Sequence, residues 1–314
     1  CIFLSASRIA VWSGLGHTAS LCAQSNTTDK EPAMQQTSAI TQNANVGGDI
    51  AIHAGNVTHI FGTDNDAQQV TALDDVSIDV SKGELLCLIG PSGCGKSTLL
   101  NIMGGLIEPT RGDVQLGAAK VSGPMPHDVA FVFQESALFP WSTVVDNVIV
   151  ALEFQGVPKE ERSARAWSAL ESVDLADFGN HYPGQISGGM KQRAQLARAL
   201  SLETEILLMD EPFGALDEQT RMILGEDLSV MLSKTDKTIV FVTHSLAEAV
   251  FLADRVAVMS ARPGKFKEVI EVGEGHPRDP DFMLSEKFGK MRNDLYGMLH
   301  DEIRKAVDGE SAQP

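Results

Sequence analysis

The sequence predicts an α/β domain built around a largely parallel sheet. From about residue 56, short apolar runs alternate with stretches of helical periodicity, as in strands joined by crossover helices. The apolar runs are continuous rather than alternating, which is typical of strands buried on both faces. Hydrophobic residues make up 43% and charged residues 21% of the 314 residues, so the chain can bury a sizeable core.

The predicted strands fall into two groups. Segments 57–61 and 76–80 come first and are assigned to a smaller antiparallel sheet. Strand signals give way to helical ones between residues 140 and 200, for example over 164–173, which predicts a helical subdomain over about 136–200. The parallel sheet is assigned the four runs Leu85–Ile89, Val129–Phe133, Ile206–Met209 and Ile239–Val242.

The N-terminal part differs from this core. Residues 1–55 contain no convincing strand or helix signal, and 30–48 are dominated by Gln, Thr, Ser, Asn and Gly, so we expect a disordered extension. Met34 is a candidate for the true start of the chain. A signal peptide over 1–21 is the alternative, but Arg8 interrupts its apolar region and a basic start is missing.

The C-terminal section, 276–314, is predicted to form an amphipathic helix and a tail. Over 282–305 apolar residues recur at three- and four-residue steps, which gives a helix one apolar face. Packing of that face on the core is the expected role, with a dimer contact and a regulatory tail as alternatives. The apolar positions are Leu284, Phe288, Met291, Leu295, Met298 and Leu299.

The chain is strongly acidic. Its 42 Asp and Glu outnumber 25 Lys and Arg, for a formal charge of −17. Such a chain lacks the broad basic surface that non-specific nucleic-acid binding needs, so no nucleic-acid partner is expected. Any polyanion must be held by a local site. The sequence also lacks the run of about 18 apolar residues that would span a membrane.

Residues 90–97, Gly-Pro-Ser-Gly-Cys-Gly-Lys-Ser, match the phosphate-loop pattern G-x-x-x-x-G-K-[ST]. The match follows a buried strand and opens an apolar helix, so backbone N–H groups and the helix N-terminus can converge on phosphate oxygens. Lys96 should reach the β- and γ-phosphates, and the Ser97 hydroxyl should ligate Mg²⁺. The predicted ATP-binding residues here are Gly90, Pro91, Ser92, Gly93, Cys94, Gly95, Lys96, Ser97 and Thr98.

A thiol inside this loop, that of Cys94, leads to a further expectation. Bulky alkylating agents should inactivate hydrolysis, and ATP should protect against them.

Two acidic residues, Asp210 and Glu211, directly follow the apolar run Ile206–Met209. Asp210 can hold Mg²⁺, and Glu211 can act as general base toward the attacking water. Many strands end in an acid, so the pattern is weak alone. Together with the phosphate loop and its Lys96, it predicts an ATP hydrolase.

The order of the motifs resembles that of ABC-transporter ATP-binding subunits, over roughly residues 57–275. Ile186–Arg193 resembles the signature motif of this family. Gln134 resembles its Q-loop glutamine, Ala215-Leu216-Asp217 its D-loop, and His244 its switch histidine. We therefore assign an ABC ATP-binding domain to residues 56–275.

The resemblance implies a P-loop NTPase core with an antiparallel β subdomain and an inserted α-helical subdomain. It also implies a homodimer in which the signature of one subunit closes over the ATP on the phosphate loop of the other. Asp217 would lie at the dimer seam, and the signature residues in contact with ATP would be Ser187, Gly188 and Gly189.

Three further roles follow from the resemblance. Gln134 would join the Mg²⁺ site and act in catalysis with Glu211, and His244 would contact the γ-phosphate. Phe61 resembles the aromatic residue that stacks on adenine, although a core phenylalanine is the alternative reading of this position.

Three short segments resemble the corresponding segments of the nitrate/sulfonate/taurine importer group. These are Leu138–Val144, Phe213–Asp217 and Ala261–Gly264. The resemblance implies a separate integral-membrane permease that contacts the chain near Gln134–Trp141, and a solute-binding protein as an indirect partner. Phe139 and Trp141 would anchor that contact, or would pack within the helical subdomain.

The sequence thus predicts an ATP-hydrolysing translocase subunit of an ABC importer, peripheral on the cytoplasmic face of the plasma membrane. Mg-ATP binding and hydrolysis in a dimer would drive uptake of a small solute. The alternative is a non-transport ABC ATPase that acts on ribosomes or nucleic acid. A single set of motifs and the acidic balance argue against it.

Overall fold

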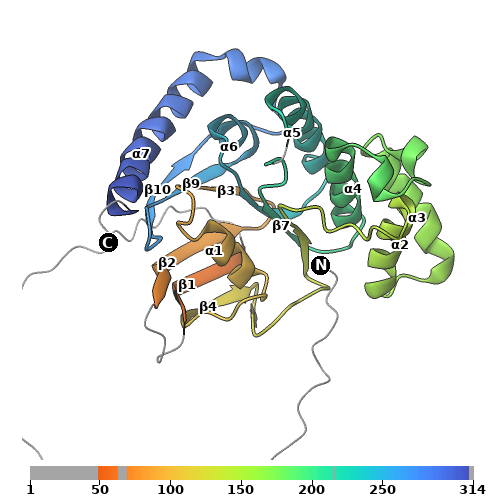
Figure 1. Ribbon diagram of the computed structural model, residues 1–314, viewed down its shortest axis with the longest axis horizontal. Helices are drawn as coiled ribbons and strands as arrows, with labels where there is room; N and C mark the ends of the chain where they lie inside the picture. Colours follow the sequence, from red (N-terminus) through yellow and green to blue (C-terminus); the bar gives the residue numbers. More distant parts are fainter. Residues whose placement is uncertain (1–48, 63–68, 215, 311–314) are drawn as a thin grey trace, which may run out of the picture. The chain divides into compact units, whose positions relative to one another are not determined.

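A computed structural model of the chain describes residues 49–62, 69–214 and 216–310, with side chains up to residue 305. The larger of its two sheets has six strands in the order β10-β9-β3-β8-β7-β6 (Figure 1). All neighbours are parallel except β10 and β9. The strands are β3 (Leu85–Ile89), β6 (Val129–Val132), β7 (Ile206–Asp210), β8 (Thr238–Val242), β9 (Arg255–Met259) and β10 (Phe266–Glu271).

The smaller sheet is antiparallel, which confirms the prediction, and has the order β2-β1-β4-β5. Its strands are β1 (Ile50–Phe61), β2 (Val70–Ser81), β4 (Arg111–Leu116) and β5 (Ala119–Lys120).

The first strand begins earlier than predicted. It starts at Ile50 rather than Val57, so the expected boundary between residues 55 and 56 falls inside β1. Ile52 and Ala54 are fully buried, but the small residues of Ala54-Gly55 have low strand propensity and hid the pattern. The predicted extension over 1–48 lies outside the described residues.

Helices cover both faces of the larger sheet. α1 (Lys96–Met103) lies between the two sheets (Figure 1). The described part of the chain has two hydrophobic cores, one on each face of the larger sheet, and alternate residues of β3 belong to different cores. Leu86 and Leu88 face α1 and the smaller sheet. Leu85, Cys87 and Ile89 belong to the core on the opposite face. That core includes residues of α4 (Gly188–Leu200), α5 (Glu218–Leu232), α6 (Leu246–Leu252) and α7 (Glu286–Glu310).

The helical subdomain stands between β6 and β7 in the chain. It contains α2 (Val144–Phe154), α3 (Lys159–Glu171) and the start of α4, and α2 and α3 lie together beside the larger sheet (Figure 1). No strand occurs between residues 133 and 205, all of which are described. The side chain of Thr143 begins α2 by accepting a hydrogen bond from the Asp146 N–H (3.2 Å).

The C-terminal section forms α7, and part of its apolar face packs on the core. Phe288, Leu295 and Leu299 are buried against the sheet-covering helices. Leu284 was placed wrongly on this face, because it is 85% exposed. It ends the 3₁₀ turn Pro280–Leu284, and α7 starts only after Ser285, whose hydroxyl accepts a hydrogen bond from the Phe288 N–H (3.1 Å).

A buried arginine ties the C-terminal section to α6. Arg278 is 4% exposed and donates hydrogen bonds to the carbonyls of Val250 (2.7 Å), Ala253 (2.7 Å) and Glu274 (3.0 Å). Two of these carbonyls lie at the C-terminal end of α6, which favours a positive charge. Burial lowers the pKa of Arg278, while the charges of Asp254 and Glu274 counteract this shift.

Replacing Arg278 by alanine should therefore weaken the fold. We predict that Arg278→Ala lowers the free energy of unfolding by about 2–4 kcal/mol, because buried carbonyls lose a charged donor. Arg292 is exposed on α7, and Arg292→Ala should change stability by no more than about 0.5 kcal/mol. Urea denaturation followed by circular dichroism measures both, and equal midpoints for the two variants would contradict the assignment.

Candidate active site

The candidate site lies at the carboxyl edge of the parallel sheet. β3, β8, β7 and β6 are neighbours in that order, and each is parallel to the next. The phosphate loop follows β3, His244 follows β8, Glu211 follows β7, and Gln134 follows β6. The topology therefore brings four motifs that are distant in the sequence to one edge of the sheet.

The phosphate loop leads directly into α1, as predicted. Gly93 and Gly95 have φ values of 71° and 103°, in the left-handed region that favours glycine. A Cβ atom on Gly95 would lie 2.7 Å from Leu73 Cδ2 and 2.9 Å from the Ala72 carbonyl oxygen. Glycine is thus required at position 95 both by its backbone conformation and by the close approach of β2.

Lys96 is folded back over this loop. Its side chain is 4% exposed, and Nζ donates to the carbonyl oxygens of Gly90 (2.9 Å) and Pro91 (3.0 Å). No carboxylate of the described part lies within ion-pair distance of this ammonium. Its charge is therefore available to an incoming phosphate, which explains how a chain of net charge −17 can hold a polyanion.

Two of the three predicted magnesium ligands are in contact. The Ser97 hydroxyl donates a hydrogen bond to Asp210 Oδ1 (2.9 Å). Burial raises the pKa of Asp210, and the hydrogen bond from Ser97 opposes that shift. A hydroxyl and a carboxylate are oxygen donors of the kind that Mg²⁺ prefers, so these residues fit the ion.

Gln134 faces the carboxylate of Glu211. Its Nε2 donates to Glu211 Oε2 (3.0 Å), and His244 Nε2 lies 2.5 Å from Glu211 Oε1. Glu211 has φ 44°, an uncommon conformation for a residue with a side chain. Three of the four predicted catalytic residues, Gln134, Glu211 and His244, are thus one connected group, and the fourth, Lys96, is bonded to the phosphate loop.

Two residues that the sequence analysis did not single out support the loop of His244. Glu248 of α6 is 9% exposed and accepts a hydrogen bond from the Thr243 hydroxyl (2.6 Å). Arg221 Nε lies 3.5 Å from Glu248 Oε1, and Arg221 Nη2 donates to the Leu216 carbonyl (2.9 Å). This pair connects the D-loop to the switch histidine. Neither Arg221 nor Glu248 belongs to a recognisable sequence motif, so only the structure reveals their contact.

The signature residues begin α4. Ser187 is its N-cap, and its hydroxyl accepts a hydrogen bond from the Met190 N–H (3.3 Å). Gly188 and Gly189 begin its first turn, in which Gly188 is exposed and Gly189 half-buried. Within the described residues, no hydrogen bond joins any of the three to the phosphate loop of the same chain.

Asp217 begins the neighbouring helix, α5. It accepts hydrogen bonds from the backbone N–H (2.9 Å) and the hydroxyl (2.8 Å) of Thr220, and these bonds lower its pKa. Its position at a dimer seam stays a proposal. Ala215, the first residue of the predicted D-loop, lies outside the described residues.

Polar residues of α4 hold the segment that follows β6. Gln195 Oε1 accepts a hydrogen bond from the Ala137 N–H (3.4 Å), and Arg198 Nη1 donates to the Ala137 carbonyl (2.8 Å). Gln192 Nε2 donates to the Gln134 carbonyl (3.5 Å). Burial lowers the pKa of Arg198 to about 10, so it stays protonated at neutral pH. The signature helix and the Q-loop are therefore mechanically linked.

The loop between Gln134 and α2 presents an exposed aromatic side chain. Trp141 is 74% exposed and stacks on Phe139, with ring centroids 5.3 Å apart. The fully buried Asn147 fixes this loop, because it bonds the Phe139 N–H (2.7 Å) and the carbonyls of Ser142 and Thr143. Packing inside the helical subdomain is thus ruled out for Trp141.

Phe61 is 44% exposed at the end of β1, so the alternative of a core phenylalanine is wrong. Its ring contacts His59 edge to face, with centroids 4.5 Å apart. Phe61 pairs with Val70 of β2, the strand whose Ala72 carbonyl lies against Gly95 of the phosphate loop. Its stacking on adenine stays a proposal.

The thiol of Cys94 is buried, whereas the sequence led us to expect an accessible one. The side chain is 1% exposed and belongs to the apolar core around α1. Burial raises the pKa of this thiol, and Lys96 counteracts the shift. A covered thiol with a raised pKa predicts slow alkylation of the folded chain rather than the ready alkylation expected from the sequence.

We predict that Cys94 reacts with N-ethylmaleimide at pH 8 at least about tenfold more slowly in the folded chain than in urea, because the thiolate is the reactive form. Peptide mass spectrometry after a short pulse measures both rates. Rapid labelling in buffer that Mg-ATP suppresses would show that the thiol is accessible after all.

The chain is similar to known proteins in both sequence and structure. A family model described as ABC transporter matches residues 73–214. The uncharacterized ABC transporter ATP-binding protein MJ0412 of Methanocaldococcus jannaschii is 45% identical over 82% of this chain and 94% of its own length. A taurine import ATP-binding protein, TauB of Rhizobium johnstonii, is 41% identical over 76% of this chain and 93% of its own length.

A third relative and a solved structure are also similar to the chain. The bicarbonate transport ATP-binding protein CmpD of Synechocystis is 41% identical, covering 74% of this chain and 84% of its own length. A dimeric structure of the ATP-binding cassette MJ0796, in a post-hydrolysis state with ADP and Pi, matches with a TM-score of 0.64 and 32% identity. That match covers 71% of this chain and 100% of the cassette.

Proposed function

Because the chain belongs to the ABC transporter ATP-binding proteins and is an ATPase of that family, we propose that it powers the import of a small solute as a subunit bound to a separate permease. The observation that carries the hydrolytic part is the group at the sheet edge. The hydrogen bond between Ser97 and Asp210 joins the end of the phosphate loop to β7, and Glu211 is held between Gln134 and His244.

Each residue of this site has a part in the proposed hydrolysis. Lys96 and the N–H groups at the start of α1 would bind the β- and γ-phosphates. Ser97 and Asp210, and Gln134 through its amide oxygen, would hold Mg²⁺, which neutralises charge on the phosphates when bound. Glu211 would accept a proton from the attacking water, and His244 would hold Glu211 and reach the γ-phosphate.

We further propose that two chains form the complete site. The turn of Ser187, Gly188 and Gly189 lies at the start of α4, where the N–H groups of a helix favour an anion. In a dimer this turn would close over ATP bound to the phosphate loop of the other chain, with Asp217 at the seam. The similar cassette MJ0796 has dimeric structures, which supports this arrangement.

We predict that Glu211→Gln converts the chain to a stable dimer in Mg-ATP. Glutamine keeps the shape of the side chain but cannot accept the proton of water, so ATP persists between the subunits. Size-exclusion chromatography with light scattering measures the mass with Mg-ATP, with ADP, and for the Lys96→Ala/Glu211→Gln double variant as the control. Monomers of Glu211→Gln throughout would refute the two-chain site for the isolated protein.

The importer assignment is supported by relatives named for taurine import and bicarbonate transport. We propose that the loop of Phe139 and Trp141 binds the permease on the cytoplasmic face of the plasma membrane. A solute-binding protein would act from the other side. Within the described residues, no helix is long and apolar enough to cross a membrane, and an exposed, rigidly held tryptophan is typical of interface anchors.

We predict that Trp141→Ala lowers recovery of the permease by at least about tenfold in a mild-detergent pull-down, since hot-spot truncations cost about 2 kcal/mol or more. The matched control is Val230→Ala, which removes an exposed apolar side chain of α5 (44% exposed). Unchanged permease recovery with Trp141→Ala would contradict the docking site. Recovery of ribosomal proteins without a permease would favour a non-transport ATPase.

A further inference from the structure

Residues 260–265, between β9 and β10, lie against the phosphate loop. We call them the β9–β10 loop. A Cβ atom on Gly264 would lie 2.0 Å from the Cys94 carbonyl oxygen, so the two backbones are in direct contact. The Gly264 N–H donates to the Ala72 carbonyl (2.9 Å), and the Gly264 carbonyl accepts from the Asp74 N–H (3.1 Å). The loop is therefore fixed to β2 as well.

One side chain of the β9–β10 loop bonds the phosphate loop. Arg262 Nε donates to the Gly93 carbonyl oxygen at 3.1 Å. Gly93 has φ 71° and no side chain of its own that could restrain it. In a trans peptide group the C=O and N–H point in opposite directions, so holding the Gly93 carbonyl also sets the direction of the Cys94 N–H. Arg262 thus restricts the conformations of the loop that would receive phosphate.

The C-terminal helix holds the residue next to Arg262. Glu302 of α7 is 3% exposed, and its Oε2 accepts a hydrogen bond from the Ala261 N–H (3.0 Å). Burial alone raises the pKa of Glu302, but hydrogen bonds from Lys305, the Ala261 N–H and Lys267 outweigh it and lower the pKa. The carboxylate is therefore ionised at neutral pH and remains an acceptor.

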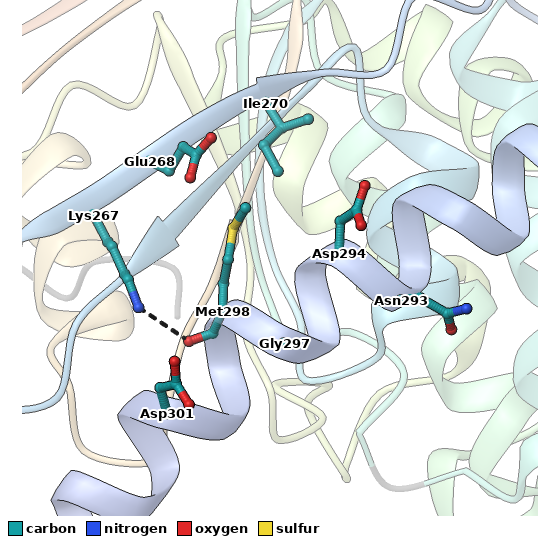
Figure 2. A pocket seen from close by; sticks show the side chains of 8 residues that line it. All are labelled: Lys267, Glu268, Ile270, Asn293, Asp294, Gly297, Met298 and Asp301. Atoms are coloured by element: carbon teal, nitrogen blue, oxygen red, sulfur yellow. Dashed lines mark hydrogen bonds between the residues drawn. The ribbon is translucent and has the colours of Figure 1, made fainter.

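Lys267 completes the attachment of α7. Figure 2 shows an open groove between β10 and α7, across which the Lys267 side chain reaches the helix. Its Nζ donates to the Met298 carbonyl (3.4 Å) and to Glu302 Oε1 (3.3 Å). Glu302 also accepts from Lys305 Nζ (2.7 Å). The last turns of α7 are thus bonded both to β10 and to the β9–β10 loop.

We propose that Arg262 is a positioning residue for the phosphate loop and that Glu302 holds Arg262 in place, so that the C-terminal helix sets the affinity for the nucleotide phosphates. This proposal rests on nucleotide binding by the phosphate loop. It gives α7 a part in the ATP site in addition to its packing on the core. Neither residue touches the catalytic group of Gln134, Glu211 and His244 through any hydrogen bond of the described part.

The test is the Kd of Mg-ADP for the full chain, measured by isothermal titration calorimetry. Arg262→Ala should raise Kd about fivefold, the effect of losing roughly one hydrogen bond. Glu302→Ala should raise Kd about threefold, and Glu302→Gln less, because the amide oxygen still accepts from the Ala261 N–H. Arg304→Ala, an exposed change on α7, is the control and should stay within about twofold.

Two further readouts separate positioning from mere stability. In steady-state hydrolysis, Arg262→Ala should raise KM and leave kcat within about twofold, because the catalytic group is intact. The Arg262→Ala/Glu302→Ala double variant should bind no more weakly than Arg262→Ala alone, since Glu302 acts through Arg262. Thermal melts show whether each variant folds. If Arg262→Ala is unstable, Arg262→Lys takes its place and should retain part of the affinity for Mg-ADP.

The outcomes are distinct. A Kd of Arg262→Ala within twofold of the parent chain overturns the proposal and leaves the proposed function intact. Additive losses in the double variant overturn the role of Glu302. Failure of the parent chain itself to bind Mg-ADP refutes the proposed function instead.

Discussion

The parallel pairing of β3, β8, β7 and β6 is the constraint on which the site depends. Parallel strands end at the same edge of a sheet, so whatever follows each strand is delivered to one place. Such strands must be buried on both faces, which explains their continuous apolar runs and the two separate cores. The smaller sheet and α1 cover one face, and four helices cover the other. Each core therefore serves to keep the ends of the strands in register.

At that edge, Glu211 is the point where the motifs meet. It is bonded to Gln134, which follows β6, and to His244, which follows β8, so a change at either neighbour would alter the surroundings of this proposed general base. A second layer, Glu248 and Arg221, connects the loop of His244 to the D-loop. Through Arg198 and its helix, the Q-loop is also tied to the signature motif. Parts that would contact another subunit or a permease are thus linked to the Glu211 carboxylate.

The motifs of the candidate site could be recognised in the sequence, whereas an edge strand and several buried side chains around it could not. The phosphate loop and the Asp210–Glu211 pair are runs of adjacent residues whose chemistry depends on local spacing, so they can be recognised without a structure. β10 was missed because it is an exposed edge strand of polar composition. Arg278 and Glu302 look like surface charges, and their burial follows from partners far along the chain. For the same reason the burial of the Cys94 thiol could not be predicted.

In the proposed dimer, each ATP lies between the phosphate loop of one chain and the signature turn of another. Mixing two inactive variants, Lys96→Ala and Gly188→Asp, tests this directly by ATP hydrolysis against the parent chain. A mixed dimer contains one site in which both the phosphate loop and the signature turn are intact. The mixture should regain a substantial fraction of the parent rate although each variant alone is inactive. A mixture no more active than its separate components would contradict this arrangement.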